Sequence, residues 1–131
     1  MGAWSAEPFG NDTACDWASE LEDSKGLSAV KKALQAVLEC DDYIDADIGE
    51  EALAAVEVIA KLLGKGTQND AYTEQVDIWV KAQTEKPDAG VIANAQQVLK
   101  RLSSEESELM ELWEDDDDFI DTLKALTHQL S

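Results

Sequence analysis

The 131-residue chain has few of the residue types on which most catalytic and metal sites depend. It contains one histidine, His128, and two cysteines, Cys15 and Cys40, which lack the C-x-x-C spacing of zinc and redox sites. Phosphate-loop, dinucleotide-binding, zinc-protease and serine-hydrolase motifs are also absent. Carboxylates alone can act as general acids and bases, so an enzyme stays an alternative. These absences favour a binding protein without metal or cofactor over an enzyme.

Long apolar segments are missing as well. No run approaches the roughly 20 apolar residues of a membrane span, and the residues after Met1 lack the basic and apolar regions of a secretory signal. Ala6 stands where a myristoylation motif needs Ser or Thr. We therefore expect a cytoplasmic protein that does not bind membranes. Its two cysteines are expected to be reduced and buried.

Basic residues are scarce relative to acidic ones. The chain has 29 Asp and Glu against 10 Lys and Arg, a net charge of −19. Direct binding to nucleic acid is disfavoured, because affinity for phosphates depends on Lys and Arg. A basic protein partner would instead be attracted, at a rate that falls as salt rises. The alternative is that the acidity only maintains solubility.

The remaining composition is typical of a globular protein. Apolar residues make up 44% of the chain and include four Trp, while proline occurs only at Pro8 and Pro87. A chain of this length buries roughly 68% of its unfolded surface on folding. We expect a single domain that spans residues 1–131.

Apolar residues recur with a helical period along most of the chain, and no stretch alternates long enough to predict a strand. Asn11, Asp12 and Thr13 are candidate caps of the first helix. We predict an all-α fold, a compact bundle of six or seven amphipathic helices, orthogonal or HEAT-like, without a clean internal repeat. The predicted helices cover about residues 14–21, 27–40, 48–63, 76–80, 87–102, 105–113 and 119–130, with Ser103 or Ser104 capping the sixth and Leu112 on its apolar side.

The segment from Ile48 to Leu63 is apolar around nearly its whole circumference and is followed by Gly64, a predicted C-cap. Such a helix belongs at the centre of a bundle. Glu57 lies among its apolar residues, and a buried carboxylate is a candidate functional group. Lys61 is four residues further on, so an ordinary helix ion pair is the simpler interpretation.

The N-terminal residues carry a more specific pattern. Met-Gly-Ala-Trp opens the chain, followed by Phe9, Asn11-Asp12, Asp16-Trp17 and Leu21. This pattern resembles the opening of an uncharacterised bacterial family, domain of unknown function 4259. Residues 50–61, 107–109 and 112–113 resemble that family's central Ala-and-Glu helix and its C-terminal Ser-Glu-Leu and Leu-Trp segments. Ser5 and Glu7 stand where relatives usually have Gly. The resemblance identifies a relative without implying an activity.

Two sets of residues are candidate binding sites. Two acidic clusters are expected to contact a basic partner, since their spacing does not match a calcium-binding EF-hand loop. The first acidic cluster is Asp41, Asp42, Asp45 and Asp47, and the second is Asp115, Asp116, Asp117 and Asp118. The other set is a possible ligand pocket in which aromatic rings lie beside amides and carboxylates, although these residues can equally anchor the N-terminal arm: Trp4, Asn11, Asp16, Trp17 and Glu57.

Three functions are consistent with these features. The leading hypothesis is an acidic binding protein, most concretely an immunity-type inhibitor that covers the basic site of a nuclease toxin. The first alternative is a small-ligand-binding protein or enzyme that uses the predicted pocket. The second is a structural protein that self-assembles through exposed Trp79 or Trp113.

Overall fold

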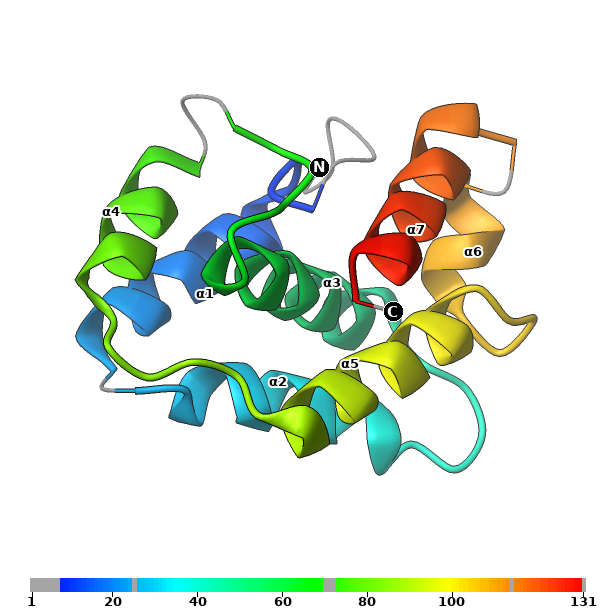
Figure 1. The fold of residues 1–131 in the computed structure, drawn as a ribbon. Coiled ribbons are helices and arrows are strands. Elements are labelled where there is room, and N and C mark those ends of the chain that lie inside the picture. Colours follow the sequence, from blue (N-terminus) through cyan, green and yellow to red (C-terminus); the bar gives the residue numbers. More distant parts are fainter. Residues whose placement is uncertain (1–7, 25, 70–72, 114, 131) are drawn as a thin grey trace.

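The structure is a computed structural model that describes residues 8–24, 26–69, 73–113 and 115–130. Within these ranges the chain forms seven α-helices and no named strand (Figure 1), so the all-α prediction is confirmed. One isolated parallel bridge joins Ile44 to Ser107. The helices are α1 (Asp12–Asp23), α2 (Ser28–Leu38), α3 (Ala46–Leu62), α4 (Glu74–Ala82), α5 (Ala89–Leu102), α6 (Glu108–Trp113) and α7 (Asp117–Gln129).

Three helices begin at an Asn or Asp that satisfies the free N–H groups of the first turn. Asn11 Oδ1 accepts from Ala14 N at 2.7 Å at the start of α1. Asp88 Oδ1 accepts from Val91 N at 2.9 Å, so α5 begins at Ala89 and not at Pro87 as predicted. Asp116 Oδ1 accepts from Asp118 N at 2.8 Å and caps α7. Short polar side chains therefore set these boundaries.

The predicted start of α6 was wrong. Ile44 N donates to Glu106 O at 2.7 Å, and Glu108 N donates to Ile44 O at 3.0 Å. These bonds hold the backbone around Ser107 beside the loop that precedes α3, so the helix begins only at Glu108. Ser107 is its cap, since its Oγ accepts from Met110 N at 3.2 Å. Leu112, predicted to be on the apolar side, is 59% exposed.

Helix α3 lies at the centre of the bundle, as predicted, and begins two residues earlier than expected. It packs against each of the other six helices. Figure 1 shows α1 and α4 on one side of α3, α6 and α7 on the other, and α2 and α5 beneath. In a HEAT-like solenoid each repeat contacts only its neighbours, so the fold is a bundle around one central helix.

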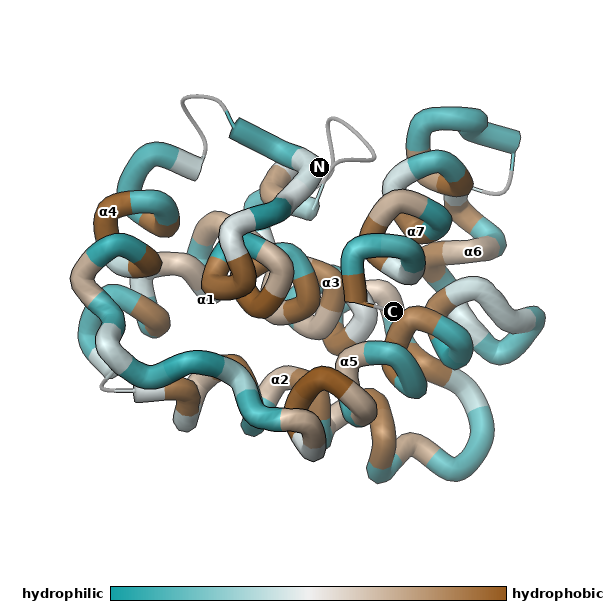
Figure 2. The backbone as a smooth tube through the Cα atoms, viewed as in Figure 1, coloured by the Kyte–Doolittle hydropathy of each residue, from teal (hydrophilic) through white to brown (hydrophobic). Residues whose placement is uncertain are grey.

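The core forms around the small residues of α3. Its Ala52, Ala54, Ala55 and Ala60 are fully buried, and short side chains let neighbouring backbones approach closely. At Gly49 a Cβ atom would lie 3.0 Å from Leu109 Cδ1, so glycine permits the contact with α6. Figure 2 shows the hydrophobic residues gathered on α3 and on the helix faces turned toward it.

A buried carboxylate organises the connection that follows α3. Glu57 has no exposed surface. Its carboxylate accepts from Thr67 N at 2.7 Å, from Thr67 Oγ1 at 2.7 Å and from Gln68 N at 2.8 Å. Burying a carboxylate costs free energy unless it is paired and hydrogen-bonded, and the loop at residues 64–69 supplies these bonds.

Lys61 extends this arrangement to other elements. Its Nζ lies 3.9 Å from Glu57 Oε2, donates to Gln68 O at 2.6 Å and lies 2.8 Å from Asp77 Oδ1 on α4. Gln68 Oε1 also accepts from Phe9 N at 2.8 Å. The predicted helix ion pair is therefore one part of a network that we call the Glu57 network: Phe9, Glu57, Lys61, Thr67, Gln68 and Asp77.

Several smaller expectations changed. Cys15 and Cys40 are half-buried and not fully buried. Trp79 is only 6% exposed, so it cannot serve as the exposed self-assembly contact, and Trp113 is half-buried against the core. In the ranges described, no helix is long and apolar enough to cross a membrane.

Replacing Glu57 tests the network. Glu57→Ala leaves the Thr67 and Gln68 donors without their buried acceptor and removes one of the two carboxylates that lie near the Lys61 ammonium. Removing one partner of a buried ion pair costs about 3–5 kcal/mol, and we expect the free energy of unfolding to fall by that amount in chemical denaturation followed by circular dichroism. The control Glu22→Ala, on the exposed surface of α1, is expected to change it by less than about 0.5 kcal/mol. A loss below about 1 kcal/mol for Glu57→Ala would contradict this role.

Candidate functional site

The most distinctive surface feature is a groove where α1, α2 and α3 meet. It consists of two adjoining hollows of about 590 Å³ and 230 Å³. Both are lined by Trp17, Glu20 and Glu51. We call it the acidic groove, because the described residues of its walls include one lysine, Lys32, against these carboxylates: Asp16, Glu20, Asp23, Asp47 and Glu51.

Helix periodicity places these carboxylates. Asp16, Glu20 and Asp23 follow one another at spacings of four and three on α1, which puts them on one face of the helix. Asp47 and Glu51 are likewise four residues apart on α3. Packing of α1 on α3 brings the two acidic faces together, with the nearly buried Trp17 between them.

The carboxylates in the groove are crowded with like charges. Burial raises the pKa of Glu51, and the nearby charges of Glu20 and Asp47 raise it further, while Lys32 lowers it. The neighbouring Glu50, only 8% exposed, has a pKa raised chiefly by burial, against a hydrogen bond with Thr13 that lowers it. The groove thus holds negative charge that a cation would neutralise.

The crowding has a consequence for stability. Because the pKa of Glu51 is raised in the folded protein, the folded state binds that proton more tightly than the unfolded state. The protonated Glu51 side chain contributes its full stability below the ordinary carboxyl pKa of 4.5. This contribution is lost as the pH rises through the raised pKa of Glu51 in the folded protein. Glu51→Gln is therefore expected to have a higher melting temperature than the wild type at pH 7, with the advantage vanishing below 4.5. Glu105→Gln removes a negative charge at an exposed position and is the control. An equal rise in its melting temperature would show that crowding around Glu51 is not the cause.

The two predicted acidic clusters lie at opposite ends of α6. Asp41, Asp42, Asp45 and Asp47 are exposed in the α2–α3 connection and at the start of α3, next to the bonds between Ile44 and the start of α6. Asp115, Asp117 and Asp118 are exposed just after α6 ends, and Asp116 is half-buried. Six residues of helix span about 9 Å, similar to the Debye length of about 10 Å. Asp47 belongs both to the first acidic cluster and to the lining of the acidic groove.

A side-chain bond holds the first cluster to α6. Tyr43 Oη donates to Glu111 Oε2 at 2.7 Å. The bond to Glu111, with the negative charges of Glu108 and Asp45, raises the pKa of Tyr43 to about 12. Ala46 N also donates to Glu108 Oε1 at 2.7 Å. The loop that carries the cluster is thus held by acidic residues of α6.

Titration of the tyrosines tests that bond. In wild-type protein, the absorbance change of Tyr43 is expected near pH 12, and Glu111→Gln is expected to return its pKa toward 10.0. The Tyr43→Phe variant identifies the step, because the chain has two tyrosines. A Tyr43 pKa that Glu111→Gln leaves unchanged would show that the loop is not held in this way.

The predicted ligand pocket does not form as one site. Trp4 lies outside the described residues. Asn11 is buried and caps α1, and Glu57 is enclosed by the loop at residues 64–69. Asp16 and Trp17 do come together, at the acidic groove. Glu20, Asp23 and Glu51 were not among the residues predicted for the site, because carboxylates three or four residues apart occur on any solvated helix face.

In the part of the chain that the structure describes, no group of His, Cys, Asp and Glu residues is arranged to hold a metal ion. Contact of the two acidic clusters with a partner stays a prediction of the sequence.

Comparison with known proteins identifies a family but no individual related protein. The model of a family described as "Domain of unknown function (DUF4259)" matches residues 2–125, which is nearly the whole chain. No curated protein matches the chain, and no solved structure does.

Proposed function

The chain belongs to the DUF4259 family, whose function is unknown, and we propose that it is a protein-binding module whose acidic groove binds a basic surface of a partner protein. The observation that carries the proposal is the convergence of five carboxylates from α1 and α3 around the two adjoining hollows of the acidic groove. A solubilising surface needs charge but no hollow. A groove lined by like charges is suited to a cationic side chain from a partner.

The distribution of charge around the groove supports a large partner. The groove continues through Asp47 into the first acidic cluster, and the second cluster follows at the far end of α6. A protein partner can contact several of these positions at once, whereas a small cation would fill only the groove. Complementary charge over such an area speeds association with a basic partner.

The most specific form of the proposal is an immunity-type inhibitor of a nuclease toxin in the cytoplasm. Nuclease sites bind phosphates and are therefore basic. A protein of net charge −19 that docks on such a site would compete with nucleic acid for the same side chains. A carboxylate-based enzyme is less well supported, because Glu57 is enclosed by the loop at residues 64–69.

Charge reversal in the groove tests the proposal. Tagged wild-type protein is used to capture partners from the lysate of the source cell, and the main captured protein is purified. Its association rate with Glu20→Lys/Glu51→Lys is expected to fall about tenfold relative to wild type and to depend less on salt. Reversal of Asp41 and Asp42, or of Asp115 and Asp117, is expected to have a smaller effect in the same direction.

The matched control is Glu22→Lys/Glu105→Lys, which changes the net charge equally at exposed positions outside the groove. It is expected to keep the association rate within about twofold. Equal slowing in both double variants would show that net charge and not the groove determines binding. Failure to capture any protein that is released by high salt would overturn the proposal, and lack of nuclease inhibition would overturn its immunity form.

A further inference from the structure

A second groove, of different character, lies between α5, α6 and α7. It has a volume of about 800 Å³ and shares no residue with the acidic groove. Its floor is apolar and comes from all three helices, and its rim carries two lysines. The residues that matter for the argument are Leu99, Met110, Ile120 and Leu123 on the floor and Lys100 and Lys124 on the rim.

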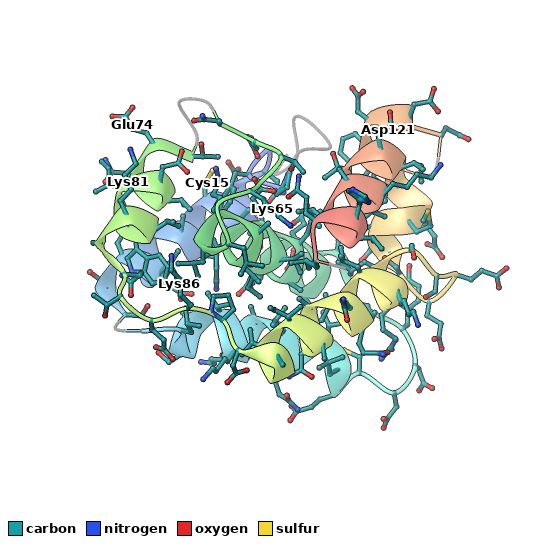
Figure 3. All side chains as sticks on the ribbon, viewed as in Figure 1. Cys15, Lys65, Glu74, Lys81, Lys86 and Asp121 are labelled. Carbon is teal, nitrogen blue, oxygen red and sulfur yellow. The ribbon has the colours of Figure 1, made fainter. Side chains whose placement is uncertain are left out.

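Among the described residues, the lining of this groove includes no acidic residue, although the chain has 29 Asp and Glu. Lys100 stands on α5 and Lys124 on α7, so the rim is positive on two sides. Both side chains are exposed, and neither pairs with a carboxylate in the described part of the chain. Figure 3 shows Asp121, also on α7, at the upper end of that helix, away from α5.

Four other basic side chains are committed to the fold. Lys65 Nζ donates to Gln129 O at 2.9 Å, Lys86 Nζ donates to Leu62 O at 3.1 Å, and Arg101 Nη2 donates to Cys40 O at 2.8 Å. Lys61 belongs to the Glu57 network. Lys100 and Lys124 perform no such internal task, so their positive charge is available to an external group.

We propose that this groove is the docking site for an amphipathic helix with acidic flanks, presented by a partner protein. A helix with an apolar stripe places its polar residues on both sides of that stripe. The stripe would cover the floor between α5 and α7, and acidic residues on each side would meet Lys100 and Lys124. Docking of an apolar helix face in a groove is a general mode of peptide recognition.

The shape of the groove favours a helix over a small ligand. Small-molecule sites bury 70–90% of their ligand, whereas this groove is about half open to solvent. The groove is also preformed, because Gln96 Nε2 donates to Leu130 O at 2.7 Å and ties α5 to the end of α7. A helix docked there pays no cost for opening the bundle.

The test uses a defined probe. The probe is a fluorescein-labelled helical peptide of about five turns, roughly 18 residues, with leucines along one face and glutamates on both sides of them. Anisotropy is measured in ~0.15 M salt, where the Debye length of about 8 Å screens the distant acidic surface. Binding is expected to weaken about tenfold in Lys100→Glu/Lys124→Glu, since each attraction becomes a repulsion.

Two controls make the result specific to the groove. Lys31→Glu/Lys81→Glu changes the net charge equally at exposed positions on α2 and α4, and its affinity is expected to stay within about twofold. A peptide with lysines in place of the glutamates is expected to bind the Lys100→Glu/Lys124→Glu variant better than the wild type.

Methyl NMR locates the bound peptide independently of affinity. Met110 is one of only two methionines and lies on the groove floor, so its labelled methyl signal, assigned with Met110→Leu, is expected to shift on binding. No binding up to about 1 mM peptide, equal weakening in both double variants, or binding without a shift of Met110 would overturn the proposal. So would binding of the protein to phosphatidylglycerol vesicles through Lys100 and Lys124 without peptide binding, or concentration-dependent dimerisation that those variants abolish.

Discussion

The buried carboxylate of Glu57 is the interaction on which the arrangement of the chain most depends. It lies in the middle of the central helix, where burial without partners would be costly. The loop at residues 64–69 turns back to supply three donors, and Lys61 connects the carboxylate to Asp77 of α4. The same loop bonds to Phe9 and to Gln129 of α7. One polar group in the core therefore fixes parts of the chain that are distant in sequence.

Basic residues are scarce in this chain, and basic and acidic side chains have different roles in the structure. With 10 basic side chains against 29 acidic ones, the fold uses four of them, Lys61, Lys65, Lys86 and Arg101, on backbone carbonyls. Figure 3 shows Lys65 beside α3 and Lys86 on the connection between α4 and α5. Acidic side chains, by contrast, stay mainly on the surface. The surface therefore carries an excess of negative charge, and the groove at Lys100 and Lys124 differs from it in sign.

Part of the candidate site was visible in the sequence. Asp16 and Trp17 were identified, and both line the acidic groove. Glu20 and Glu51 were not, because each belongs to a pair four residues apart on its own helix, and such pairs occur on any solvated helix face. Only the packing of α1 on α3 shows that the two pairs meet. Asn11 and Glu57 were assigned to the same pocket, but their oxygens are occupied by the cap of α1 and by the loop at residues 64–69.

The sequence by itself determined the helical class and the central position of α3, and it limited the cap of α1 to Asn11, Asp12 or Thr13, because these depend on local periodicity and on side chains within three residues of the backbone they bind. Tertiary structure decided the start of α6, where Ile44 holds the backbone around Ser107. It also decided that Lys61 faces Asp77, that α1 and α3 share an acidic groove, and that α5 and α7 place two lysines across an apolar floor. Each of these joins residues that are far apart in sequence, and which helices pack together is set by shape and burial over the whole chain rather than by any local pattern.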